Sequence, residues 1–205
     1  MCSFTHVRHR SSHCPEYVSA DPWKVLVAVT LLNKTPGSKS IPVFFDLIQR
    51  WPTPAALAQA PLSLLREMLK DLGLGEVRSV RLIALSQTYL EHPPAPERLH
   101  ASRGKMALPS AKGDGVVHVP YPPTPISHLP GCGPYALDSY RIFCSSGHEW
   151  KAVRPRDKEL VKYLRWKWAV EEHRQWDPLR GPGDSIHLEY ILNMTAVLAA
   201  APILH

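Results

Sequence analysis

Apolar residues recur at helical spacing through most of this chain. The run 23–32 is apolar nearly all round, which is typical of a helix buried inside a domain. Asp21 and Pro22 stand just before it, in the places of a side-chain cap and a first helical residue. Further helices are expected at 41–51, after Thr53, after Ala60 and over 76–90.

The helix expected at 76–90 has two sides of different character. Arg78 and Arg81 are predicted to form its basic side. The apolar side is predicted to consist of Val77, Val80, Leu82, Ile83 and Tyr89.

Two more helices are expected in the second half of the chain. One covers 134–144 and the other covers 157–170. The side chains of the second that are predicted to point inward are Leu160, Val161, Leu164 and Trp168. Because no segment indicates a strand, the sequence predicts an all-α helical bundle.

Residues 92–125 break the helical pattern. This segment holds eight prolines among Gly, Ser, Lys and His, a composition that forms no packed helix. We interpret it as a flexible and dispensable insertion. The alternative is that its basic residues contact DNA, namely Arg103, Lys105 and Lys112.

The two ends of the chain also differ from its middle. Residues 1–15 are interpreted as a disordered basic arm, because their cysteines and histidines match no established zinc spacing. Those residues are Cys2, His6, His9, His13 and Cys14. The domain is expected at 16–170, followed by a tail at 171–205. Whether the apolar stretch 191–204 docks as a helix or packs poorly is left open by the sequence.

Length, charge and cysteine usage narrow the class of protein. A chain of 205 residues with 44% hydrophobic residues suits one domain. A net charge of +6 favours a polyanionic partner such as nucleic acid. The scattered cysteines, among them Cys132 and Cys144, form no disulfide framework, so a reducing compartment is expected. Neither a signal sequence nor a membrane-spanning run is predicted.

The string Leu129-Pro130-Gly131-Cys132-Gly133 carries the first candidate chemistry. Two glycines two positions apart, just before an amphipathic run, predict a tight turn that opens a helix. Backbone N–H groups at such a turn suit a phosphate of DNA. A purely structural link between two helices is the alternative.

Asp157 carries the second candidate chemistry. It follows a Gly- and Pro-containing loop and stands at the start of a predicted helix. A helix cap is one role for it, since aspartate caps helices readily. A fixed carboxylate that stabilises a positively charged transition state is the other, and the two roles are compatible.

These features resemble the helix-hairpin-helix (HhH-GPD) DNA glycosylase superfamily. Within it, the chain is similar to the mismatch-specific thymine/uracil glycosylase domain of the methyl-CpG-binding-domain protein. The matching runs are Asp21-Pro22-Trp23-Lys24, Leu31-Leu32-Asn33-Lys34-Thr35, Ile41-Pro42, Leu72-Gly73-Leu74, Asp138-Ser139-Tyr140-Arg141-Ile142-Phe143-Cys144 and Trp150-Lys151. The resemblance implies a cleft between two helical subdomains and makes Asp157 the catalytic carboxylate.

The resemblance also implies roles for other residues. Tyr135 stands where strand-nicking relatives carry a lysine, which implies a monofunctional enzyme in which Tyr135 contacts the flipped base or simply packs at a helix start. Lys34, in place of the usual arginine, and Leu74 are candidates to fill the space left by that base. DNA contacts are further expected at Leu129, Gly131, Cys132 and Gly133.

The sequence therefore predicts a monofunctional glycosylase of base excision repair that removes thymine or uracil opposite guanine. The alternatives are a helix-hairpin-helix DNA-binding module without catalysis, and a glycosylase for adenine or alkylated bases. The expected partner is mispaired or damaged duplex DNA, and the protein is expected to be a nuclear monomer. No catalytic metal and no iron–sulfur cluster are expected, since no cysteine follows Cys144, while a monovalent cation at the hairpin is compatible with the resemblance.

Overall fold

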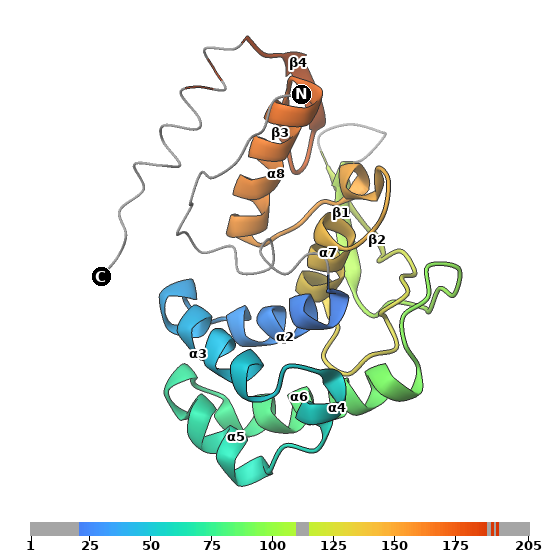
Figure 1. The fold of residues 1–205 in the computed structure, drawn as a ribbon. Helices are drawn as coiled ribbons and strands as arrows, with labels where there is room; N and C mark the ends of the chain where they lie inside the picture. Colours follow the sequence, from blue (N-terminus) through green and yellow to red (C-terminus); the bar gives the residue numbers. More distant parts are fainter. Residues whose placement is uncertain (1–20, 110–114, 188–189, 191, 193–205) are drawn as a thin grey trace, which may run out of the picture.

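Helices make up most of the computed structural model, which describes residues 21–109, 115–187, 190 and 192 (Figure 1). The helices are α2 (Pro22–Leu32), α3 (Gly37–Arg50), α4 (Pro54–Ala58), α5 (Leu62–Leu69), η1 (Lys70–Leu72), α6 (Gly75–Glu91), α7 (Pro134–Phe143), η2 (Glu149–Ala152) and α8 (Lys158–Glu172). The strands are β1 (Lys105–Pro109), β2 (Val116–Pro120), β3 (Arg174–Asp177) and β4 (Gly181–Ser185). In the part described, no helix has both the length and the apolar character needed to cross a membrane.

Local capping chemistry sets several helix starts as predicted. The Asp21 Oδ1 atom accepts hydrogen bonds from the backbone N–H groups of Trp23 and Lys24. Thr53 caps α4 through Ala56 in the same way. The helix α3 begins at Gly37, earlier than the expected residue 41, and Pro42 lies inside the helix instead of in its first turn.

Three hydrophobic clusters build the core. The helix α2 contributes to the first and second clusters, and α7 contributes to the second and third. The first cluster packs α2 against α3, α4, α5 and α6. The second packs the other side of α2 against α7 and the chain before it. The third packs α7 and η2 against α8 and β3. Figure 1 shows the result, with α2 lying between the lower helices α3 to α6 and the upper helices α7 and α8. The predicted all-α class is confirmed for the helical body.

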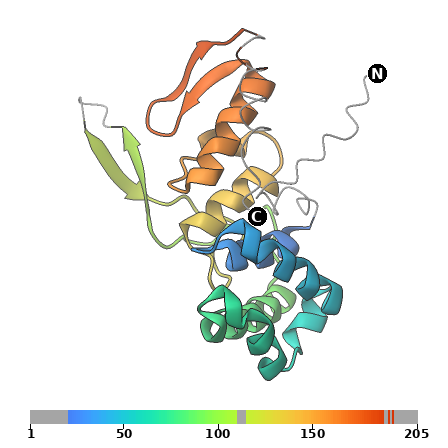
Figure 2. The same ribbon diagram turned by 90° about the vertical axis from the view of Figure 1, so that its left-hand side faces the viewer.

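The prediction that the chain has no strands was wrong. β1 and β2 pair antiparallel within the segment 92–125 and project to one side of the helices (Figure 2). Met106 and Tyr121 are buried in the second cluster, and a Cβ atom on Gly104 would lie 3.2 Å from Pro134 at the hairpin. Part of the predicted insertion is therefore packed against the domain, because Met106 of β1 and Tyr121, just after β2, reach the core.

A second antiparallel pair, β3 and β4, follows α8 in the predicted tail. Trp176 of β3 is buried in the third cluster, so the folded domain extends past residue 170. The predicted arm at 1–15 lies outside the described residues, as does 191–204 except residue 192.

The two sides of α6 differ in part from the prediction, since Leu82, Ile83 and Tyr89 pack in the core but Val77, Val80 and Arg78 do not lie as expected. Val77 and Val80 are each 49% exposed, whereas Arg78 is only 3% exposed. Leu82 is buried as expected. The reason is that backbone carbonyl groups of two loops meet Arg78 inside the protein, as described below.

Candidate active site

A tight turn joins the second cluster to α7, as the glycine spacing predicts. The Cys132 N–H donates to the Leu129 carbonyl at 3.3 Å, and the Gly133 N–H donates to the Gly131 carbonyl at 2.9 Å. Gly131 has φ of 84°, a left-handed conformation that suits glycine. Gly133 is the N-cap of α7 and offers no side-chain cap, so an external anion meets no competing side chain from the cap residue.

Arg81 of α6 lies directly on this turn. A Cβ atom added to Gly131 would collide with the Arg81 Cδ atom and would lie 3.0 Å from its Cγ atom. Position 131 therefore needs glycine both for its backbone angle and for the space that Arg81 takes. The contact also puts a positive charge beside the N-terminus of α7, where a phosphate would be attracted.

A small pocket connects the turn to the loop that carries Lys34. Its volume is about 150 Å³. The residues that line it come from α2, α6, the turn and α7, and they are Val29, Thr30, Asn33, Arg81, Gly131, Gly133, Pro134, Tyr135 and Ala136. Asn33 immediately precedes Lys34 in the chain. The pocket thus brings together two of the features predicted from the sequence, the turn and Tyr135, whereas Lys34 and Asp157 are not among its lining residues.

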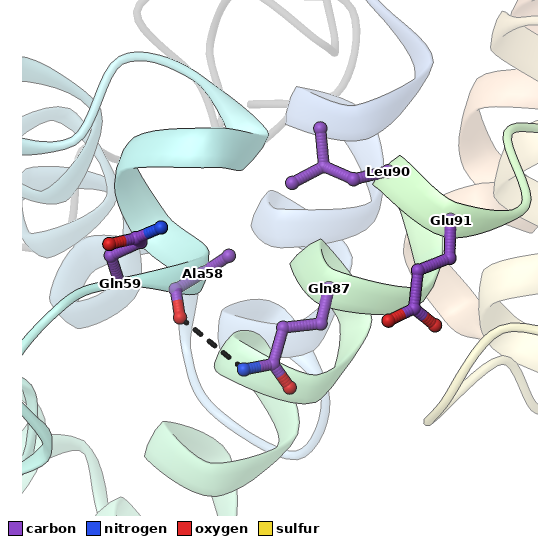
Figure 3. Close-up of a pocket in the computed structure, with 5 residues that line it drawn as sticks. All are labelled: Ala58, Gln59, Gln87, Leu90 and Glu91. Carbon is purple, nitrogen blue, oxygen red and sulfur yellow. Dashed lines mark hydrogen bonds between the residues drawn. The ribbon is translucent and has the colours of Figure 1, made fainter.

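A larger hollow of about 430 Å³ contains none of the predicted site residues. It lies between α4 and α6 and is lined by Ala58, Gln59, Gln87, Leu90 and Glu91 (Figure 3). The Gln87 Nε2 atom donates to the Ala58 carbonyl across it at 3.5 Å. We do not assign the chemistry to this hollow, because it lacks a turn, a carboxylate at a helix start or a basic side chain.

Asp157 caps α8, as expected from its position in the sequence. Its Oδ1 atom accepts hydrogen bonds from the N–H groups of Glu159 and Leu160, each at 3.0 Å. Val153 and Leu160, on either side of it, are buried in the third cluster and fix the loop. In the described part of the chain, no hydrogen bond involves the Asp157 Oδ2 atom. Capping therefore holds the carboxylate and leaves one oxygen for a ligand.

Tyr135 stands between the turn and the helix that Asp157 caps. It is partly buried and packs against both the second and the third cluster. The ring therefore spans from the turn toward the helices that hold Asp157. This position is compatible with either predicted role, as a contact to a flipped base or as a packed residue.

The side chains of the other predicted DNA-contact residues differ in their exposure to solvent. Lys34 and Leu74 are exposed, with φ of 61° and 53° respectively. Leu129 is 3% exposed, so its side chain supports the turn from inside. Burial raises the pKa of the Cys132 thiol to about 12, which keeps it neutral at physiological pH. The backbone N–H groups of Leu129 and Cys132 already donate to the Ile126 and Leu129 carbonyl groups, so a DNA contact by either residue stays a prediction.

The carbonyl groups of this turn could also bind a cation. The Leu129 and Gly131 carbonyl oxygens each have a second lone pair beyond the N–H bond that they accept, which suits a hard cation. A monovalent cation there stays a prediction. No group of three or more His, Cys, Asp or Glu side chains fit to hold a metal occurs within the described ranges, and the cysteines and histidines of the arm lie outside them.

Asp138 is a buried carboxylate that the sequence analysis did not assign to the site. It lies on α7, is 5% exposed and accepts a hydrogen bond from the Tyr121 hydroxyl. Burial raises the pKa of Asp138 to about 6, against the opposing effects of Tyr121 and Arg141, and the negative charge of Asp157 adds to the rise. Two carboxylates are therefore in electrostatic range of each other. The sequence does place an aspartate on the inner face of α7. Its partner Tyr121, however, lies in the segment 92–125, which was expected to be a flexible insertion.

The raised pKa of Asp138 predicts a specific pH dependence of stability. The stabilising preference for the protonated carboxyl is complete below about pH 4 and is lost as pH rises through about 6. Relative to an Asp138→Asn variant, the parent should therefore lose about 2–3 kcal/mol of unfolding free energy between pH 4 and pH 8. Urea unfolding of both proteins across this range measures it. Asp46→Asn, at an exposed site on α3, is the control, and parallel pH curves for parent and Asp138→Asn would contradict the prediction.

Comparisons with known proteins agree with the motifs. No protein-family model matches the chain. Over 69 residues, 34% of this chain and 31% of the relative, it is 39% identical to the thymine-DNA glycosylase of Aeropyrum pernix. Over 143 residues, 70% of this chain and 25% of the relative, it is 29% identical to the methyl-CpG-binding domain protein 4-like protein of Arabidopsis thaliana. The chain thus spans between a quarter and a third of the length of these relatives.

Among solved structures, a thermostable thymine-DNA glycosylase has a TM-score of 0.47 and 18% identity, over 67% of this chain and 52% of that chain. The sequence matches, the glycine turn ahead of α7 and the aspartate that caps α8 agree with the resemblance seen in the sequence. The chain is therefore similar to DNA glycosylases of the helix-hairpin-helix family.

Proposed function

We propose that this chain is a monofunctional DNA glycosylase that hydrolyses the bond between deoxyribose and a thymine or uracil mispaired with guanine. The observation that carries the proposal is Asp157, a carboxylate fixed by two backbone donors and electrostatically close to α7. The turn at the start of α7 offers a phosphate site. The substrate is duplex DNA, which also suits the net charge of +6.

The proposed reaction depends on charge in the sugar. As the bond from C1′ to the base breaks, its electron pair leaves with the base and positive charge builds on the deoxyribose. The carboxylate of Asp157 stabilises that charge, and a water molecule supplies hydroxide to C1′ while its proton goes to the departing base. The two capping bonds keep the carboxylate in place, so little reorganisation is needed as the charge develops.

The pocket beside the turn supports a single-ring base as the leaving group. A cavity of about 150 Å³ is large enough to admit benzene, a ring of the same size as a pyrimidine. Uracil is smaller than thymine by one methyl group, so a pocket that takes thymine also admits uracil. A mispaired base leaves the stack more readily than a paired one, which favours mismatches as substrates.

Tyr135 supports hydrolysis without strand cleavage. A lyase of this family needs an amine that attacks the sugar and forms a Schiff base, and a phenol forms none. Borohydride added during turnover should therefore trap no covalent complex between the protein and DNA. A lysine-containing bifunctional glycosylase treated in parallel is the positive control, and a strong trapped band from this chain would contradict the prediction.

Base release under single-turnover conditions tests the proposed function. Duplexes carrying G·T, G·U, a mispaired adenine or an alkylated base are incubated with excess protein, and released base is measured by chromatography. We expect release from G·T and G·U. Binding without release from any duplex would favour a non-catalytic DNA-binding module, and release of adenine or an alkylated base alone would favour the other alternative.

A further inference from the structure

Two exposed loop residues share an uncommon backbone conformation. Lys34 and Leu74 have φ of 61° and 53°, and within the described residues only His173 joins them as a non-glycine residue with positive φ. Leucine avoids this region, since its side chain crowds the backbone there. Leu74 is also 62% exposed, which is unusual for an apolar side chain held in strained backbone. The surrounding structure must hold both residues in place.

Arg78 makes the contacts that hold these loops together. Its Nη1 atom donates to the carbonyl groups of Leu72 and Gly73, each at 2.9 Å. Its Nη2 atom donates to the Asn33 carbonyl and to the Thr35 hydroxyl, each at 2.6 Å. One planar guanidinium thus binds the residues just before Leu74 and the residues on both sides of Lys34.

Thr35 adds a direct link between the same two loops. Its hydroxyl accepts the hydrogen bond from Arg78 and donates to the Leu72 carbonyl at 3.3 Å. The three residues therefore form a closed set of hydrogen bonds across segments some 40 positions apart in the chain. A lysine has one donor nitrogen and cannot span both loops in this way.

The burial of Arg78 is difficult to explain by stability alone. Among the described ion pairs, none joins a carboxylate to Arg78, so this 3% exposed cation is satisfied by neutral oxygens. Burial and the nearby charge of Arg81 lower the pKa of Arg78, which reflects the unfavourable environment. Apolar side chains commonly replace buried charges without loss of stability. Yet α6 turns Val77 outward and Arg78 inward, a local conflict of the kind found at functional sites.

We propose that Arg78 is a positioning residue that fixes the loops of Lys34 and Leu74 in one arrangement, so that both side chains enter the duplex together at the target base. This inference rests on the proposed function. The two side chains can enter the space of an extruded base together only when both loops are ordered at the same time. Loops that are ordered before binding lose less conformational freedom on binding, which strengthens the complex.

The test measures insertion without relying on catalysis. Arg78→Lys and Thr35→Val are compared with the parent for affinity toward a duplex with a stable abasic site and toward an intact duplex. Fluorescence of 2-aminopurine next to a G·T mispair reports unstacking. For Arg78→Lys we expect the preference for the abasic duplex to fall roughly tenfold, with loss of the fluorescence rise. Affinity for the intact duplex should change little, because the hairpin turn and Arg81 are untouched.

Ser86→Ala is the matched control. Ser86 is also a buried polar residue of α6, but it bonds to Trp23 and Leu82 and to neither loop. This variant should be less stable than the parent. At equal folded fraction it should keep the parent's preference for the abasic over the intact duplex. If Arg78→Lys does not fold, Thr35→Val, which removes one hydroxyl from the set, carries the same expectation with a smaller change.

Combining variants separates positioning from general structural support. In a protein that already carries Lys34→Ala and Leu74→Ala, adding Arg78→Lys should reduce the abasic preference no further, because its effect passes through those side chains. An additive loss, or an Arg78→Lys protein with parent preference and fluorescence, would overturn the inference. A parent that prefers the abasic duplex but releases no base would contradict the proposed function and leave the positioning role supported.

Discussion

Replacing Asp157 by asparagine is expected to lower the single-turnover rate of base release by two orders of magnitude or more. One electrostatic group lost from a closed site raises the barrier by about 3 kcal/mol. The asparagine side chain keeps a carbonyl oxygen, which can still accept the N–H bonds that Asp157 accepts from Glu159 and Leu160. The cap of α8 and the thermal stability should therefore change little.

The control for this experiment is Glu159→Gln, which removes a negative charge from the same first turn of α8. Glu159 pairs with Lys162 and not with the proposed substrate site. Its loss should leave base release near the parent rate. Affinity for a G·T duplex should persist or rise in the Asp157→Asn protein, because a carboxylate near phosphates repels DNA. Near-parent release by that protein would remove Asp157 from the mechanism.

Much of the helical framework could be predicted because it depends on neighbours in the chain. Asp21 and Thr53 cap α2 and α4 through amides two or three residues away. Asp157 caps α8 in the same manner. The apolar stripe of α8 also faces inward as expected, with Leu160, Leu164 and Trp168 buried. Short-range chemistry of this kind is visible in sequence alone.

The orientation of α6 could not be predicted because it depends on distant carbonyl groups. A pattern of apolar and polar residues places Val77 and Val80 inside and Arg78 outside. The partners of Arg78 include Asn33 and Thr35, more than 40 residues away. Four hydrogen bonds from the guanidinium determine the orientation, and no local pattern reports them.

The strands within 92–125 could not be predicted for a similar reason, because their packing depends on residues distant in the chain. Its prolines argue against a central strand, but β1 and β2 form only one isolated pair, in which edge positions tolerate proline. Tyr121 then reaches Asp138 on α7, and Met106 reaches the second cluster. The candidate site was therefore only partly visible. Tyr135, Asp157 and the turn were found from spacing, whereas Asp138 needed a partner whose position only the fold supplies.

Gly131→Ala is the second variant with a large expected effect. Alanine is strained at φ of 84°, and its Cβ atom would collide with the Arg81 Cδ atom. The backbone term and the collision together should lower the unfolding free energy by roughly 2–4 kcal/mol. The turn and Arg81 must also shift, so affinity for duplex DNA should fall about tenfold at equal folded fraction, in line with one lost charge-assisted phosphate contact.

Gly147→Ala separates the two contributions to this effect. Gly147 has φ of 73°, but a Cβ atom there would meet nothing within 4 Å. This control keeps the backbone strain without the collision, so it should lose only about 1–2 kcal/mol and bind DNA as the parent does. Shortening the colliding side chain in a Gly131→Ala/Arg81→Ala double variant should restore stability toward the control but not DNA affinity, because the cation beside the turn is gone. Urea unfolding and duplex titration measure both quantities, and a Gly131→Ala protein that binds DNA at parent affinity would show that the turn is not the phosphate site.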